Sequence, residues 1–310
     1  MPDLSLAPRQ LYSLRRAFTI FFDYKGTAKG LMRCVAVLTA FFQLLGAVLF
    51  DTPIKPFGPA LDMDKFELVW SDEFDGTEVN RDIWKGHYTY GQIASVRRGG
   101  YFHRDMAFVR DGNLIIRTEY KDEGLGGGGP GYYSFGMDTR DTYEQLYGYF
   151  EVRCILPKGH DLWAAFWMIN EGTFHIDGDS ADGAEIDIFE SPNWGKGKIF
   201  RDSITHAVHF DGYGEYHQSQ LFGTYYVNNP YEEYNTYGLE WNEEGYIFYI
   251  NGIETVRSNY GLSHNPEYLI LSVEVGGDNA IPAAGLSKND YPADYIVDYV
   301  RAYQYKDLIQ

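Results

Sequence analysis

Three carboxylates crowd into six residues of the sequence, at Glu185, Asp187 and Glu190 in the run EIDIFE. Ile186 and Ile188 lie between them, and alternation of β-branched with polar residues is typical of a half-buried strand. On a strand, Glu185 and Asp187 share one face and the isoleucines take the other. Strict alternation puts Glu190 on the isoleucine face, where an unpaired carboxylate is costly. We therefore predict a β-bulge between Asp187 and Glu190, which returns Glu190 to the acidic face.

Three acids on one strand face are suited to glycoside hydrolysis. That reaction needs one ionised carboxylate, which attacks the anomeric carbon or stabilises the cation, and one protonated acid, which releases the leaving oxygen. Close spacing favours this asymmetry, because the charges of two carboxylates raise the proton affinity of the third. The alternative is that the acids form the solvated face of an edge strand.

Aromatic residues and a histidine on two nearby predicted strands favour a sugar site. Trp163 and Trp167 share a face of LWAAFWMI, and tryptophan faces stack on sugar rings. In ITHAVHF, His209 faces away from His206, which shares its side with apolar residues. We therefore predict His209 as a site residue and His206 as a core histidine. Core positions remain the alternative for the two tryptophans.

Composition and charge narrow the range of partners. The chain has 310 residues, of which 45% are hydrophobic and 17% aromatic, enough apolar material for one large core. The formal charge is −18, and residues 1–33 carry six basic and two acidic side chains (+4), so the remainder carries −22. So acidic a body repels polyanions, which argues against nucleic acid and heavily sulfated substrates. We expect a monomer that acts on a neutral polysaccharide.

The chain before the acidic body contains an uncharged apolar run at residues 34–50, CVAVLTAFFQLLGAVLF, preceded by a basic segment at 1–33. A helix of this length spans roughly 25 Å, the short end of a transmembrane helix. We expect a signal peptide or membrane anchor, with Met32 as an alternative translation start and a buried core helix as the alternative fold. The positive-inside bias then places the acidic body outside the cytoplasm. Residues 51–64 are rich in proline and predict a linker or an extended entry into the domain.

From about residue 65 to 306 the sequence is a series of short β-type runs separated by Gly, Asn, Asp and Pro. Asn251-Gly252, between YIFYI and IETV, is a strong hairpin signal. No sustained helical period follows residue 51. The pattern predicts an all-β domain, an antiparallel sandwich or jelly roll.

The run EIDIFE resembles the E-x-D-x-x-E signature of glycoside hydrolase family 16 in its bulged form, of the laminarinase and β-glucanase type. Further family motifs follow in order, and these are VWSDEFDG (69–76), DGNLIIRT (111–118), YGYFEVRCILPKGHDLWAAFWM (147–168) and VDYVRAYQ (297–304). The resemblance covers roughly residues 65–306. It implies a concanavalin A-like jelly roll with the substrate cleft on the concave sheet.

The resemblance also implies a retaining double displacement that needs no cofactor. Glu185 would be the nucleophile, Asp187 the assisting acid and Glu190 the acid/base. Retention places the carboxyl groups of Glu185 and Glu190 about 5–5.5 Å apart. Further residues implied at the cleft are Trp163, Trp167, Trp194 and His209, the last of them near the acid/base.

Many members of the family hold a structural calcium, and the matching positions here are Glu73, Gly112 and Asp298. Asp298 alternates with apolar residues in YIVDYVRAY, so the pattern predicts an acid on an apolar face that needs a partner. A capped or salt-bridged aspartate is the alternative, and we treat calcium as optional.

Two departures from the family pattern leave the sugar linkage open. The segment RRGGYFHRD (97–105) replaces the N-N-E-x-Q-Y stretch common in laminarinases, and Met137 follows Gly136 where arginine is common. Both segments line the glycone end of the cleft in relatives. Arg97 and Arg98 are therefore candidates to bind sugar hydroxyls or an anionic substituent, with surface charge or salt bridging as the alternative.

We expect an endo-acting enzyme that hydrolyses β-1,3 or mixed β-1,3/1,4 glucans. The alternatives within the family are an agarase- or carrageenase-like endo-galactanase and a transglycosylase. A non-catalytic glycan-binding sandwich is the alternative outside enzymes, although such a protein would be expected to have lost one or more of the acids.

Overall fold

The structure of the chain, a computed structural model, describes residues 52–309 apart from 90–91 and 279. The predicted basic segment at 1–33 and the predicted signal peptide or membrane anchor at 34–50 lie outside the described residues. Within the described part of the chain, no helix is long and apolar enough to cross a bilayer.

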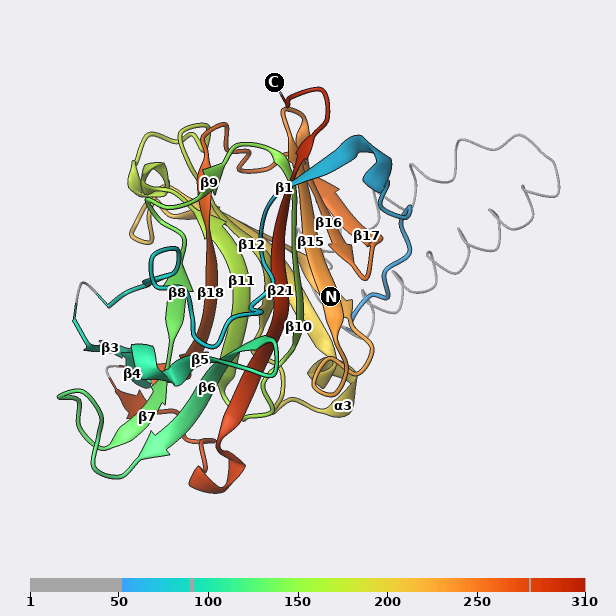
Figure 1. Ribbon diagram of the computed structural model, residues 1–310. Helices are drawn as coiled ribbons and strands as arrows, with labels where there is room; N and C mark the ends of the chain where they lie inside the picture. Colours follow the sequence, from blue (N-terminus) through green and yellow to red (C-terminus); the bar gives the residue numbers. More distant parts are fainter. Residues whose placement is uncertain (1–51, 90–91, 279, 310) are drawn as a thin grey trace, which may run out of the picture.

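Two large, mostly antiparallel β-sheets pack face to face, which confirms the predicted all-β jelly-roll sandwich (Figure 1). We call them sheet A and sheet B. Sheet A has the strand order β14 (Gln218–Tyr226), β13 (Ser203–Phe210), β12 (Glu185–Ser191), β11 (Leu162–Ile169), β18 (Glu267–Val275), β8 (Gly136–Asp138) and β2 (Lys85–Gly86), with β9 (Glu144–Gln145) also paired to β18.

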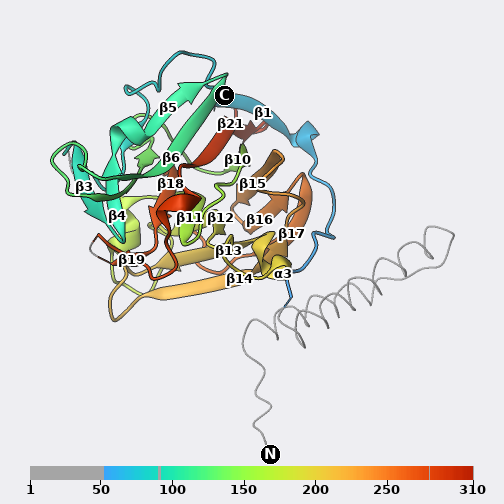
Figure 2. The same cartoon turned by 90° about the horizontal axis from the view of Figure 1, so that it is seen from below.

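Sheet B forms the other layer of the sandwich, and Figure 2 shows the two layers from below. Its strand order is β17 (Ile253–Ser258), β16 (Gly245–Ile250), β15 (Asn235–Asn242), β10 (Gly148–Ile155), β21 (Ala293–Tyr305), β6 (Asn113–Lys121), β7 (Gly131–Ser134), β4 (Gly100–His103) and β3 (Ala94–Arg97), with β1 (Phe66–Asp72) paired to β21 and β5 (Ala107–Arg110) paired to β6.

Short elements lie before β1 and in the connections between the strands. They are the 3-10 helices η1 (Met63–Lys65), η2 (Arg104–Met106), η3 (Glu171–Phe174) and η4 (Lys288–Asp290), the single-turn helix α3 (Lys198–Arg201), and the pair β19 (Gly277–Asp278) and β20 (Ile281–Pro282).

The core fills the space between the two sheets and explains the alternation in the sequence. One buried cluster contains Phe150 and Val152 of β10 together with Phe166 and Met168 of β11, all of them fully buried. Burial of each such side chain contributes about 1.5–3 kcal/mol to the free energy of folding. The intervening residues of β11 face away from this core, toward the site described below.

The predicted hairpin at Asn251-Gly252 is present between β16 and β17. Both residues have positive φ, +50° and +70°, as a type I′ turn requires.

Residues 52–61 lie along the edges of both sheets, so this segment is an extended entry into the domain. The backbone N–H of Ile54 donates to the carbonyl oxygen of Thr224 in β14. The backbone N–H of Tyr226, also in β14, donates to the carbonyl oxygen of Ile54. Ala60 forms an antiparallel bridge with Ile253 of β17. A covered edge is protected from pairing with another chain.

Candidate active site

The predicted bulge in β12 is present, and it sorts the side chains of this strand between the core and a cleft. Asp187 pairs with Ala207 of β13 and Glu190 pairs with Thr205, so β12 carries one residue more than β13 over this span. Glu185 and Glu190 remain partly exposed. The side chains that enter the core are Ile186, Ile188 and Phe189, all fully buried.

The three acids line a cleft of about 1090 Å³ on sheet A. Alternate residues of β11 and β18 form its floor beside them, so Trp163 and Trp167 lie on the same face as the acids, as their spacing predicts. Trp167 is only 6% exposed, and its indole N–H donates to Ser272 at 3.1 Å. Trp163 is the more accessible of the two tryptophans.

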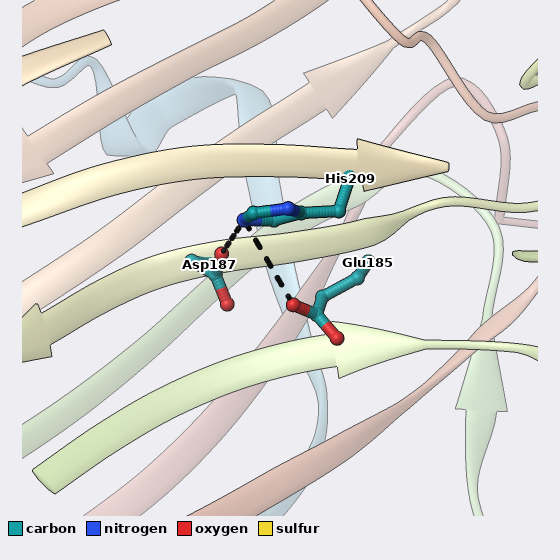
Figure 3. A group of neighbouring side chains, drawn as sticks. All are labelled: Glu185, Asp187 and His209. Atoms are coloured by element: carbon teal, nitrogen blue, oxygen red, sulfur yellow. Dashed lines mark ion pairs between the residues drawn. The ribbon is translucent and has the colours of Figure 1, made fainter. Parts of the chain in front are cut away.

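His209 of β13 lies beside Glu185 and Asp187 (Figure 3). Its Nε2 is 3.4 Å from Asp187 Oδ2 and 4.0 Å from Glu185 Oε1. Strand pairing sets His209 directly opposite Glu185, and its charge also acts on Glu190, near which the resemblance implied its position. The other ring nitrogen, Nδ1, is 2.9 Å from His217 Nε2, so the imidazole connects the acids to the loop that follows β13.

Two of the acids accept hydrogen bonds from aromatic side chains. The indole N–H of Trp163 donates to Glu190 Oε1 at 2.8 Å, and the Tyr213 hydroxyl donates to Glu185 Oε2. Tyr213 lies in the β13–β14 loop and was not predicted as a site residue. Tyr213 is far from β12 in sequence, so the sequence pattern does not reveal this contact. Its position soon after His209 could have indicated that it lies near the site.

Burial is the main cause of the proton affinities of the acids, ahead of the mutual repulsion predicted from the sequence. It raises the pKa of Glu190 well above its usual range, and the charges of Asp187 and Glu185 add to the effect. It also raises the pKa of Asp187 well above its usual range, with the charge of Glu185 second. Burial raises the pKa of Glu185 as well, but there the Tyr213 hydrogen bond and the charge of His209 oppose it. This environment favours a proton on Glu190 and a charge on Glu185.

Arg97 and Arg98 reach the cleft and share one carboxylate, that of Glu274 on β18. The Nε–H of Arg97 donates to Glu274 Oε1 at 2.6 Å, and Arg98 Nε lies 3.3 Å from Oε2. The Arg97 guanidinium lies 4.0 Å from the Tyr88 ring centroid, and that of Arg98 lies 5.0 Å from the Trp163 ring. Two guanidinium groups and one carboxylate make this trio of side chains net positive.

Further cleft residues that the sequence did not reveal come from β8, β18 and the chain after β2. His87 Nδ1 lies 2.6 Å from Asp138 Oδ2, and both side chains are buried. Burial lowers the pKa of His87. Arg140 lies 4.9 Å from the Tyr268 ring centroid and forms an ion pair with Glu171 at 3.1 Å. Only the pairing of β2 with β8 and of β8 with β18 brings these positions together.

Trp194 is not among the described residues that line the cleft. Its ring packs edge-on against Tyr231 at a centroid distance of 4.8 Å, and Arg201 lies 5.6 Å from its centroid. The prediction rested on its closeness in sequence to Glu190. The strand ends at Ser191, however, and the chain beyond it packs elsewhere.

The side chains predicted to hold calcium are engaged with guanidinium groups. The two carboxylate oxygens of Glu73 accept hydrogen bonds from Arg301 at 2.9 and 2.8 Å, and Asp298 accepts one from Arg153. Gly112 lies in the β5–β6 turn with φ +69°. Because a cation already neutralises each carboxylate, these side chains do not fit a calcium site, and the salt-bridged alternative describes Asp298.

Asp298 also does not lie on the apolar face that simple alternation assigned to it. Arg153 of β10 pairs with Tyr299, whereas the next residue, Cys154, pairs with Val297. Asp298 is therefore the extra residue of a second bulge, in β21, and a bulge residue leaves the regular alternation.

Comparison with known families and proteins agrees with this geometry. The glycoside hydrolase family 16 domain of beta-porphyranases A–D matches residues 66–305. A beta-glucanase of Rhodothermus marinus is 28% identical over 267 residues, covering 77% of this chain and 86% of the relative. A keratan-sulfate endo-1,4-beta-galactosidase of Sphingobacterium multivorum is 29% identical over 253 residues, covering 77% and 55%.

A solved laminarinase catalytic domain from Thermotoga maritima has the same fold, with a TM-score of 0.61 and 26% identity over 77% of this chain and 98% of that one. The chain spans about half the length of several of the curated relatives that it matches. The family domain matches most of the chain, and the three acids of this chain lie on the bulged strand β12. The chain is therefore a glycoside hydrolase that belongs to family 16.

Proposed function

We propose that this protein is a retaining endo-glycosidase that hydrolyses β-1,3 or mixed β-1,3/1,4 glucans by double displacement. The observation that carries the proposal is the unequal environment of the acids on one strand face. Glu185 has a hydrogen-bond donor in Tyr213 and a neighbouring histidine, whereas burial and negative charge favour a proton on Glu190. The likeness to a beta-glucanase and a laminarinase supports a glucan substrate.

In the first step, the Glu185 carboxylate attacks the anomeric carbon while the glycosidic C–O bond breaks. Glu190 gives its proton to the departing oxygen, which leaves a glycosyl ester on Glu185 and a carboxylate at Glu190. In the second step, Glu190 takes a proton from water as the water oxygen attacks the anomeric carbon. Glu185 leaves as a carboxylate, so both residues return to their starting states. Asp187 lies between them on the strand and holds a proton or a charge as the two exchange roles.

A galactan is the second candidate substrate. The matching domain is of the beta-porphyranase type, and one relative is a keratan-sulfate galactosidase. The net positive trio of Arg97, Arg98 and Glu274 would attract an anionic substituent at the cleft, even though the body of the protein is acidic overall. A glucan needs no such charge.

Digestion of a panel of laminarin, lichenan, barley glucan, agarose, porphyran and carrageenan tests the substrate. Internal cleavage of the glucans, with oligosaccharide products of retained anomeric configuration, is the expected result. Cleavage of a galactan alone would overturn the glucan assignment and leave the retaining mechanism in place. The matched control is Glu185→Gln, which should show no cleavage of any polymer.

We also propose that the domain acts outside the cytoplasm as a monomer. The apolar run at 34–50, preceded by basic residues, supports export or anchoring. N-terminal sequencing of exported protein tests whether this run is removed, and light scattering tests the oligomeric state.

A further inference from the structure

A buried histidine contacts the bulge of β12 from the side of the core. His206 of β13 is fully buried, as predicted for a core histidine, and its Nδ1 lies 2.5 Å from the carbonyl oxygen of Ile188. In the register with β11, Asp187 and Phe189 are paired and Ile188 is skipped. Ile188 is therefore the extra residue of the bulge, and His206 contacts its carbonyl group where the regular ladder is interrupted.

The protonation state of His206 follows from its contact with Ile188 and from its burial. A carbonyl oxygen only accepts, so Nδ1 must carry the hydrogen. Burial lowers the pKa of His206 to about 3, so the ring is neutral and Nε2 has a free lone pair. The hydroxyl of Thr255 on β17 lies 3.0 Å from Nε2 and 3.0 Å from the carbonyl oxygen of Phe248, and its one hydrogen can be donated to either acceptor. His206 thus contacts sheet B at Thr255 and the bulge of sheet A at the Ile188 carbonyl group.

The contact between His206 and the Ile188 carbonyl group affects the position of one acid, Glu190, more than that of the others. Ile188 lies two residues before Glu190, and the bulge decides which face Glu190 takes. Glu185 and Asp187 precede the bulge and are held by regular pairing with β13. A buried carbonyl without a donor is unfavourable, so loss of the His206 N–H would make the backbone at Ile188 turn toward another donor. Glu190 would move with it.

We propose that His206 is a positioning residue for the acid/base Glu190. It holds the bulge in the one conformation that points the Glu190 carboxyl group at the departing oxygen, and the Ile188 carbonyl selects the tautomer of His206 that carries the hydrogen on Nδ1. The inference rests on the proposed function, because it assigns Glu190 the role of proton donor.

A comparison of leaving groups tests this proposal. Polysaccharide cleavage needs a proton from Glu190, whereas 2,4-dinitrophenolate departs without one. For His206→Leu we expect kcat/KM on the polysaccharide to fall by about ten- to a hundred-fold, the cost of a misplaced general acid. We expect kcat/KM on the dinitrophenyl glycoside of the shortest oligosaccharide released by the wild-type enzyme to change little. His206→Asn, whose side-chain N–H replaces that of Nδ1, should recover most of the polysaccharide activity.

Equal losses on both substrates, or unchanged activity on the polysaccharide, would overturn the proposal. Thermal unfolding identifies a variant that does not fold. If His206→Leu is such a variant, Thr255→Val carries the test, because it removes the hydroxyl that contacts Nε2 and helps to hold the ring in place, and it should show the same selective loss at smaller size. An equal effect of Thr255→Val on both substrates would then contradict the proposal. Failure of the proposed function is distinguishable, since the wild-type enzyme would then cleave no polysaccharide.

Discussion

Trp163 donates its indole N–H to Glu190 Oε1 at 2.8 Å, so a tryptophan of the cleft floor is coupled directly to the proposed acid/base. Hydrogen bonding to a carboxylate favours its ionised form. This contact therefore opposes the burial that raises the pKa of Glu190, and it keeps that pKa from rising further. We therefore expect Trp163 to have two roles, to stack on a sugar ring and to limit the proton affinity of the acid.

Replacing Trp163 by phenylalanine should move the basic limb of the pH profile. Glu190 must be protonated to act, so kcat/KM falls as pH rises through its pKa. Loss of a donor to a charged group raises that pKa, and the basic limb should move up by about one pH unit. Trp167→Phe is the matched control, because the indole of Trp167 donates to Ser272 instead of to an acid. A basic limb that stays in place in Trp163→Phe would contradict this coupling.

Replacing Tyr213 by phenylalanine should move the acid limb of the pH profile. Its hydroxyl donates to Glu185, which must be ionised to attack, and the hydrogen bond lowers the Glu185 pKa. Without the hydroxyl, the acid limb of kcat/KM should move to higher pH by about one unit. Tyr216 lies in the same loop and is 61% exposed, so Tyr216→Phe should leave the profile unchanged. If the acid limb of Tyr213→Phe lies at the same pH as that of Tyr216→Phe, the Tyr213 hydroxyl does not lower the Glu185 pKa.

The bulge in β12 could be predicted from the sequence because its cause is local. Burying Glu190 among isoleucines is unfavourable, and this cost alone requires a bulge within six residues. The bulge at Asp298 has no such local signal, since its partner Arg153 lies 145 residues away in sequence. Alternation alone therefore assigned Asp298 to the wrong face.

The walls of the cleft depend on strand order, which the sequence pattern leaves open. His87 and Asp138 lie 51 residues apart and meet only because β2 pairs with β8. Tyr213 reaches Glu185 from a loop 28 residues further along the chain. Trp194 shows the converse, since closeness in sequence to Glu190 does not place it in the cleft once the strand has ended.

Glu267 should make the protein less stable as the pH rises. This carboxyl group is fully buried at the start of β18, accepts a hydrogen bond from the Ala184 N–H, and has its pKa raised to about 8 by burial, from a usual 4.5. The folded state therefore binds more protons than the unfolded state between these values. The stability that neutral Glu267 contributes is complete below pH 4.5 and is lost as pH rises through about 8.

Glu267→Gln removes this titration and keeps an oxygen to accept from Ala184. Between these pH values, the free energy of unfolding of the wild-type protein should fall more steeply with pH than that of the variant, by up to about 1.4 kcal/mol per pH unit. Urea unfolding across the pH range measures both slopes. Parallel curves would show that Glu267 is already ionised in the folded protein at neutral pH.

Calcium should leave the thermal stability unchanged. A ligand that binds only the folded state stabilises it by RT ln(1 + [L]/Kd), so Tm rises with the ligand concentration. Glu73 and Asp298 are paired with Arg301 and Arg153, so we expect the same Tm in calcium and in a chelator. A Tm that rises steadily with calcium concentration, and that a chelator lowers again, would show that these ion pairs give way to the metal.

We propose Glu185 as the nucleophile of a double displacement, and trapping the covalent intermediate tests this role. The protein is incubated with a 2-deoxy-2-fluoro glycoside of an oligosaccharide that it cleaves, and the labelled peptide is sequenced by mass spectrometry. We expect one sugar ester, on Glu185. A label on Asp187 or Glu190, or full turnover with no covalent species, would contradict it.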